Sequence, residues 1–278
     1  MKSIFDTYSF EASKRVTKSY STSFYAGIKC LDKKIRNDVH AIYGLVRFAD
    51  EIVDTFHDFD KEELLKEFKQ ATYDAIERKI SLNPILNSFQ ATVNKYSIDH
   101  TLIEQFFHSM EMDLAPVEYN KEEYEKYILG SAEVVGLMCL KIFVYGDEKE
   151  YQRLKPSAMK LGSAFQKINF LRDLKNDYND LGRTYFPNLD TENMSAEDKK
   201  QIEREIDAEF KEAKAGIVEL PKSSRFGVYL SYVYYTSLLR RIKRKTTREL
   251  LTDRIRVSNN VKALLFAKSY ILNRINQL

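Results

Sequence analysis

Two pairs of aspartates with the same spacing place the strongest constraint on how this chain folds. Asp50 and Asp54 form the first pair, Asp173 and Asp177 form the second, and in each pair the acids are four residues apart. Both pairs lie in segments whose apolar residues recur with helical periodicity. Residues four apart share one face of a helix, so each pair directs two carboxylates toward one point. If the two helices face each other, four carboxylates line one cleft.

Four carboxylates in one cleft need a neutralising partner. Like charges held close together repel and raise each other's pKa. Hard divalent cations are the natural neutralisers, and Mg²⁺ in proteins is usually held by a few carboxylates together with substrate phosphates. We therefore expect Mg²⁺ at this cleft, or Mn²⁺ in its place.

The first pair belongs to a longer polar stripe. Tyr43, Arg47, Asp50 and Asp54 follow one another at steps of four, three and four residues, while most of their neighbours are apolar. A helix that is apolar around most of its circumference is buried. Buried charges need partners or ligands, so this stripe indicates either a binding site or an internal salt bridge between Arg47 and Asp50.

The second pair repeats the same design. Gln166, Asn169, Asp173 and Asp177 follow at steps of three, four and four on another largely apolar segment. One such stripe can be purely structural, but two stripes with matching ends favour a ligand site. The amide groups of Asn169 and Gln166 add neutral oxygen ligands for a metal or donors for a phosphate.

Arginines accompany the acids. Arg172 precedes Asp173, and Arg183 follows in the segment 182–187. A guanidinium group matches the geometry of a phosphate through two parallel hydrogen bonds. Carboxylates, Mg²⁺ and arginines together describe a diphosphate site. The sequence has no glycine-rich phosphate loop, so a nucleotide is not implied.

Almost every segment has helical periodicity, and 9 Gly and 5 Pro in 278 residues are few for an all-β protein. We expect an all-α protein with one domain, 1–278, and no internal linker. Asp32, Asp60 with Glu63, and Ser195 with Asp198 are expected helix caps, and residues 21–25 an expected turn. Residues 182–193 are an expected loop. The expected helices cover residues 10–20, 33–57, a segment after Asp60, 121–145, 148–178, 196–216, 224–245 and 258–275.

Bulk properties exclude several classes of protein. A net charge of +3 is too small to indicate nucleic acid binding. Cys30 and Cys139 match no metal or redox spacing, and the four histidines form no zinc or di-iron set. The N-terminus lacks a signal peptide pattern, and no apolar run approaches the ~18 residues of a spanning helix. We expect a cytoplasmic protein, at most peripheral to the inner face of the membrane. The basic run 240–245 is either a solvated helix end or a contact for anionic lipid.

Four segments resemble the squalene/phytoene synthase family, the head-to-head prenyl synthases, over most of the chain. Residues 20–25 are similar to its Ser-Phe segment, 47–54 to its first aspartate motif, and 132–136 to its Val-Gly segment. Residues 165–177, followed by 183–187, are similar to its second aspartate motif. The chain departs from the pattern at Lys175-Asn176, where the family often has Gly-Glu. It also departs at Glu133, where many members have a small residue and where we expect a shifted pocket wall.

The resemblance implies the isoprenoid-synthase helical bundle, with the two aspartate helices facing each other across a central cavity. The residues it implies for catalysis are Asp50, Asp54, Asp173, Asp177 and Tyr43. Those it implies for substrate binding are Ser21, Phe24, Arg47, Gln166, Asn169, Arg172 and Arg183. Those it implies as metal ligands are Asp50, Asp54, Asn169, Asp173 and Asp177.

The resemblance also implies a reaction. We expect two geranylgeranyl diphosphates to condense to phytoene through a cyclopropyl diphosphate, the first step of carotenoid biosynthesis, without NADPH. One alternative is a squalene or dehydrosqualene synthase that uses farnesyl diphosphate. Another is a non-catalytic assembly or binding module, which would predict eroded aspartate motifs. A terpene cyclase is disfavoured, because cyclases pair one aspartate-rich motif with an Asn/Ser/Glu motif. The oligomeric state is not determined by the sequence.

Overall fold

In a computed structural model of the chain, the described residues are 1–115, 119–179, 185–187, 194–252 and 254–275, with only the backbone described at 176–179. These residues form helices and turns and contain no strand, which confirms the all-α fold class. The helices in chain order are α1 (Lys2–Tyr20), α2 (Thr22–Lys29), α3 (Lys33–Thr55), α4 (Lys61–Arg78), α5 (Pro84–Tyr96), α6 (His100–Met112), α7 (Lys121–Ile128), the π-helix η1 (Leu129–Glu133), α8 (Val134–Phe143), α9 (Glu148–Asn179), α10 (Ala196–Glu219), α11 (Lys222–Lys243), α12 (Thr247–Leu250) and α13 (Asn259–Arg274).

Side-chain caps fix the start of several helices where the sequence predicts them. The Asp32 carboxylate accepts a hydrogen bond from the Lys34 amide at the start of α3 (2.9 Å). Ser195 and Asp198 form a complete capping box at the start of α10. Each cap satisfies an amide that has no partner inside its helix. At α4 the prediction is half right: Asp60 caps the Glu63 amide (3.0 Å), but no reciprocal bond from Glu63 completes a box.

The first predicted helix is too short, and the turn predicted at 21–25 is wrong. The first helix starts at Lys2 rather than at residue 10, and only Ser21 breaks the helical path before α2. Ser21 has an extended backbone, and its hydroxyl accepts a hydrogen bond from the Phe24 amide (3.2 Å). The serine therefore begins a new helix instead of ending in a loop, because a hydroxyl at this position replaces the missing backbone acceptor.

The single helix predicted at 121–145 is divided by η1. Gly130 lies in this π-helix, and a Cβ atom there would come within 2.4 Å of the Gln105 carbonyl oxygen of α6. Only glycine permits such a close approach between the two backbones. The predicted boundary between α8 and α9 is correct: Gly146 adopts φ +78°, a left-handed conformation that glycine reaches without strain.

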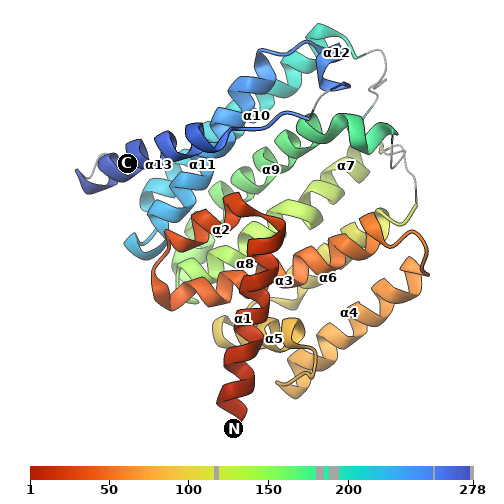
Figure 1. The fold of residues 1–278 in the computed structure, drawn as a ribbon, viewed down its shortest axis with the longest axis vertical. Coiled ribbons are helices and arrows are strands. Elements are labelled where there is room, and N and C mark those ends of the chain that lie inside the picture. Colours follow the sequence, from red (N-terminus) through yellow and green to blue (C-terminus); the bar gives the residue numbers. More distant parts are fainter. Residues whose placement is uncertain (116–118, 180–184, 188–193, 253, 276–278) are drawn as a thin grey trace.

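The aspartate helices α3 and α9 occupy the middle of the molecule together with α8 (Figure 1). One apolar core joins α3 and α8 to the α4–α6 side, and a second joins α9 to α7, α10 and α11. The fold thus holds two acid-bearing helices between two separate cores. None of the helices in the described part of the chain is both long and apolar enough to cross a membrane.

Candidate active site

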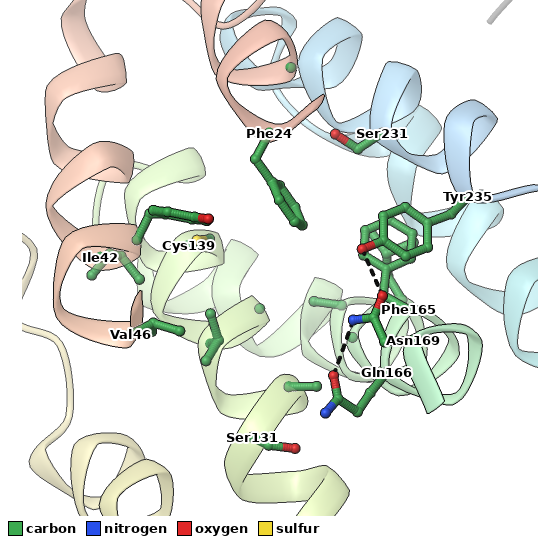
Figure 2. Close-up of a pocket in the computed structure, with 18 of the residues that line it drawn as sticks. Phe24, Ile42, Val46, Ser131, Cys139, Phe165, Gln166, Asn169, Ser231 and Tyr235 are labelled. Atoms are coloured by element: carbon green, nitrogen blue, oxygen red, sulfur yellow. Dashed lines mark hydrogen bonds between the residues drawn. The ribbon is translucent and has the colours of Figure 1, made fainter. Parts of the chain in front are cut away.

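A cavity of about 650 Å³ opens between α2, α3, α8, α9, α10 and α11. This volume lies in the range of sites that enclose small organic ligands. Much of the lining is apolar, and Figure 2 shows Phe24, Ile42, Val46 and Phe165 among the side chains around the hollow. The central cavity that the sequence led us to expect is therefore present.

The cavity has an apolar end and an acidic end. Its lining follows α3 from Val39 to Asp54 and α9 from Leu154 to Asp173. At 1.5 Å per residue these stretches span about 22 Å and about 28 Å. On both helices the charged residues come last, so a long apolar chain can lie along the cavity with a charged group among the acids.

Ten of the twelve residues selected from the sequence line this one cavity. Asp177 belongs to α9, but its side chain lies outside the described residues, and so does all of Arg183. The ten that the structure brings together are Ser21, Phe24, Tyr43, Arg47, Asp50, Asp54, Gln166, Asn169, Arg172 and Asp173. Their chemical roles stay predictions.

On α3, Asp50 is a partly buried carboxylate beside another acid. Burial and the negative charge of Asp54 together raise the pKa of Asp50 to about 7, while Arg47 opposes the shift. The predicted alternative of an Arg47–Asp50 salt bridge is wrong, since Arg47 forms its ion pair with Glu51. Asp50 thus keeps a demand for positive charge.

Arg47 is positioned for an anion. Its guanidinium group stacks on the Tyr20 ring at 4.4 Å, and its Nε has no hydrogen-bond partner among the described residues. A buried donor without a partner costs free energy unless a ligand or water satisfies it. A phosphate oxygen in the cavity would supply that partner.

On α9, Asp173 is already neutralised. Arg172 contacts its carboxylate through Nε (3.1 Å) and Nη2, and Arg254 contacts it from outside the helix (2.7 Å). Arg254 also lines the cavity, although the sequence did not single it out. A pairing 81 residues distant carries no local pattern by which it could have been found.

A short hydrogen-bonded chain connects α9 to α11. The Tyr235 hydroxyl donates to Asn169 Oδ1 (3.2 Å), and Asn169 Nδ2 donates to Gln166 Oε1 (3.3 Å), as Figure 2 shows. The Tyr235 ring stacks on Phe165 with 3.9 Å between centroids. These contacts fix the amides of Asn169 and Gln166, which the sequence analysis selected. The residue that orients them, Tyr235, was not selected.

Aromatic rings continue across the cavity. The Phe24 ring lies 5.9 Å from Tyr43 and 6.3 Å from Tyr235, between centroids. Burial raises the pKa of the Tyr43 hydroxyl to about 12, so this group stays protonated. Ring faces attract cations within about 6 Å, so the middle of the cavity suits a passing positive charge.

A buried acid that the sequence reasoning missed completes the site. Asp113 follows α6, lines the cavity and accepts hydrogen bonds from the hydroxyls of Tyr127 (2.7 Å) and Tyr185 (3.4 Å). Its negative charge also raises the pKa of Asp50. The only signal in the sequence is an acid directly after the apolar helix 100–112, which by itself reads as an ordinary helix end.

The expected shift of the cavity wall at Glu133 is not seen. The lining includes Ala132 and Val135 on either side of it but not Glu133 itself. Its carboxylate lies instead in the field of Lys160 and Lys167 of α9, away from the cavity.

The acids and amides fit a divalent cation, although they do not form a closed cluster. Within the part of the chain that the structure describes, no group of three or more acidic, histidine or cysteine side chains is close enough to hold a metal alone. Asp50 and Asp54 nevertheless line the cavity one helical turn apart, and carboxylate oxygens are the ligands that Mg²⁺ prefers.

Known proteins share this arrangement. A family model described as Squalene/phytoene synthase matches residues 17–260. Phytoene synthase 1 from Zea mays is 27% identical over 92% of the chain and 66% of its own length. Phytoene synthase 2 from Solanum lycopersicum is 29% identical over 92% of the chain and 87% of its own length.

Solved structures resemble the fold. A dehydrosqualene synthase crystallised with a ligand superposes with a TM-score of 0.82, at 19% identity, over 97% of this chain and 98% of that one. Squalene synthase HpnC from Alicyclobacillus acidocaldarius gives a TM-score of 0.73 at 20% identity, over 85% and 93% of the two chains.

Proposed function

The chain belongs to the squalene/phytoene synthase family, and on this premise we propose that it is a prenyltransferase that joins two geranylgeranyl diphosphates head to head, giving phytoene in a Mg²⁺-dependent reaction. The observation that carries the proposal is a long apolar cavity with carboxylates and guanidinium groups together at one end. The phytoene synthases at 27% and 29% identity support this product over others of the family. Phytoene would enter carotenoid biosynthesis.

The charged end suits diphosphate. Arg47, Arg172 and Arg254 all line it, and the Nε of Arg47 has no partner among the described groups. Guanidinium groups bind phosphate oxygens through paired hydrogen bonds. The apolar length of the cavity would hold the prenyl chains, whose burial supplies most of the binding free energy.

Mg²⁺ would be held by the carboxylates and one amide, and when bound it would supply positive charge that stabilises the departing diphosphate. The residues proposed to hold it are Asp50, Asp54, Asn169, Asp173 and Asp177. The raised pKa of Asp50 supports this assignment, because a carboxylate that binds a cation loses the cost of its buried charge.

The side chains around the cavity would then direct carbocation chemistry. Loss of diphosphate from one substrate gives an allylic cation, and the double bond of the second substrate attacks it to form a cyclopropyl diphosphate. A second ionisation and rearrangement joins the chains, and each half of the reaction releases one diphosphate and one proton. Apolar walls exclude the water that would quench these cations. The rings of Phe24, Tyr43 and Tyr235 offer them negative faces.

Farnesyl diphosphate is the second candidate substrate. The dehydrosqualene synthase structure is the reason to keep it, although an identity of 19% supports the shared fold alone. Squalene, unlike phytoene or dehydrosqualene, also needs a reductant such as NADPH. Substrate length and NADPH dependence therefore separate the alternatives.

A product assay tests the proposal. Purified protein with Mg²⁺ would receive each prenyl diphosphate separately, with and without NADPH, and the hydrocarbons would be identified by mass and ultraviolet spectrum. A conjugated triene from geranylgeranyl diphosphate, indifferent to NADPH, is the expected result. Squalene or dehydrosqualene from farnesyl diphosphate would establish the second candidate, and a folded protein without product would favour a binding module.

A further inference from the structure

The C-terminal helix α13 exposes its apolar side chains. Its one fully buried residue is Ser269, whereas Leu264 is 69% exposed and Ile271 is 59% exposed. Tyr270 and Ile275 are exposed as well. Leu264, Ile271 and Ile275 recur at steps of seven and four, so they share one face of the helix. An exposed cluster of large apolar side chains on the outside of a protein indicates an interaction surface.

The charge of this region has one sign. Between residues 254 and 275 the sequence contains no aspartate or glutamate. The basic residues in the same stretch are Arg254, Arg256, Lys262, Lys268 and Arg274. Lys268 and Arg274 are exposed on α13, and Lys268 lies on the same face as Leu264 and Ile271, between them along the helix. An apolar face with only basic neighbours is the pattern of helices that lie in a membrane surface.

The inner side of α13 is firmly attached. The Tyr234 hydroxyl of α11 donates to the Lys262 carbonyl (3.1 Å), and the Lys262 ammonium donates to Ser23 Oγ (2.7 Å). The Phe226 ring of α11 contacts Phe266 and Tyr270 at about 6 Å. In Figure 1, α13 lies at the edge of the molecule, beyond α11. The helix is therefore held on one side and presented on the other.

We propose that α13 docks the protein on an anionic lipid bilayer, with Leu264, Ile271 and Ile275 at the boundary between headgroups and acyl chains. Lys268 and Arg274 then lie at the level of the lipid phosphates, where each basic residue contributes to binding. A second copy of this chain fits the surface less well, because a two-fold contact would place the basic residues of both copies together.

The basic run 240–245 suits lipid less well than α13. Lys243 forms an ion pair with Asp207, and Lys245 pairs with Glu249. Charges that already have carboxylate partners attract an anionic surface less. Two of the five basic residues in this run are therefore less available to lipid than Lys268 and Arg274 of α13.

Docking by α13 would bring the cavity near the bilayer. Gly227, Ser231 and Tyr235 of α11 line the cavity, and α13 packs against the same helix. The helix α11 thus lies between the proposed docking face and the cavity. The proposed docking by α13 does not depend on the proposed prenyltransferase reaction, since it rests on the exposed apolar and basic side chains of this helix alone.

Vesicle co-sedimentation tests this surface with the full chain. Wild-type protein is expected to bind vesicles of mixed phosphatidylglycerol and phosphatidylcholine, to be released by salt, and to ignore pure phosphatidylcholine. The double variant Lys268→Gln/Arg274→Gln should bind about thirtyfold more weakly. The variant Leu264→Ser/Ile271→Ser should lose at least about tenfold, because two apolar side chains no longer leave water.

Leu82→Ser is the matched control. Leu82 is 90% exposed between α4 and α5, far along the chain from α13, so its loss should leave vesicle binding unchanged. Circular dichroism would confirm that every variant is folded. Absence of wild-type binding, or equal binding by the α13 variants, would overturn the proposal. Self-association in sedimentation velocity that disappears in Leu264→Ser/Ile271→Ser, without any vesicle binding, would assign the surface to a second copy instead.

Discussion

The helices α3 and α9 present aspartates to the same cavity in different electrostatic states. On α3, burial and Asp54 raise the pKa of Asp50 to about 7, and the nearby Arg47 pairs with Glu51. On α9, Asp173 contacts two guanidinium groups, from Arg172 and Arg254. Asp50 therefore has no ion pair within the described part of the chain, whereas Asp173 has two.

This difference suggests a division of labour. A divalent cation gains most at α3, where it relieves buried negative charge. A diphosphate gains most where arginines are held ready, and binding it would draw Arg172 and Arg254 away from Asp173. Metal and substrate would thus have to bind together, the metal to neutralise the acids of α3 and the diphosphate to bind the arginines.

The largest expected effect comes from removing the Asp50 carboxylate on α3. Asp50→Asn should lower kcat about a thousandfold or more, because stabilisation of the leaving diphosphate is lost. The same change should leave the midpoint of urea unfolding equal or higher, since a buried repulsion disappears. Steady-state kinetics and urea titration followed by circular dichroism check both results.

Asp58→Asn is the matched control for Asp50→Asn. Asp58 is exposed just beyond α3, so its replacement should change neither kcat nor stability. Full turnover by Asp50→Asn would show that the carboxylate pair on α3 does not hold the metal, and the contrast between the two walls would then lose its functional meaning.

The next effect concerns the contact between α3 and α1. Burial lowers the pKa of His40 to about 4, and the ring hydrogen-bonds Thr17 Oγ1 (2.9 Å). Lys14 and Arg36 lower the pKa as well, while Glu11 opposes them. Between about pH 6.5 and about pH 4, His40 is protonated in the unfolded chain but not in the folded chain. The free energy of unfolding therefore decreases as the pH falls.

This titration should cost about 2 kcal/mol of unfolding free energy between about pH 7.5 and about pH 5. His40→Gln removes the titrating group and keeps a polar side chain beside Thr17, so its stability should fall less over the same interval. Urea unfolding at both pH values measures the difference. Parallel losses in wild type and variant would show that His40 titrates normally.

A smaller effect is expected on the α9 wall. Arg254→Gln should raise the KM for prenyl diphosphate by about tenfold, because one charged hydrogen bond to phosphate is lost. The same change should lower the Mg²⁺ concentration for half-maximal activity, since Asp173 loses a competing cation. If the KM and the Mg²⁺ requirement shift in the same direction, Arg254 does not exchange Asp173 for phosphate. The exposed Arg256→Gln is the control and should change neither value.

Much of the fold was predictable because its signals are local. Helical periodicity and caps such as Asp32 and Ser195 identified most elements, and the aspartate spacing identified both cavity walls. The one-residue break at Ser21 and the π-helix η1 were missed. A turn and an N-cap use the same residue types, and the π-helix depends on how closely α6 approaches Gly130.

The charge state of the site was not predictable from spacing. Arg254 reaches Asp173 from a segment 81 residues away, and Asp113 is recognisable only by the tyrosines that contact it. The equal spacing of the aspartates on α3 and α9 predicted two electrostatically similar sites. The ion pairs depend instead on which side chains from distant segments contact each aspartate. Glu133 is a further example, because its position in the sequence motif predicted a residue of the cavity wall, whereas the lining does not include it.

Glu133 provides the smallest test of the contrast between the two walls. It lies on η1 beside α9. Burial and the charge of Glu209 raise its pKa to about 7, with Lys160 and Lys167 opposing the shift. The folded chain therefore keeps a proton between about pH 4.5 and about pH 7 that the unfolded chain releases. Stability falls as the pH rises through this window and stays lower above it.

Glu133→Gln removes this penalty, so the variant should be more stable than wild type by about 1 kcal/mol at about pH 8 and equal to it at about pH 5. The pH response would be opposite to that of His40, because the group on α3 destabilises the fold in acid and the group beside α9 destabilises it in alkali. Urea unfolding at the two pH values measures it, with the exposed Glu125→Gln on α7 as control. A variant that is destabilised at about pH 8 would mean that the ionised Glu133 stabilises α9 through Lys160 and Lys167. The contrast between α3 and α9 would then be limited to the residues that line the cavity.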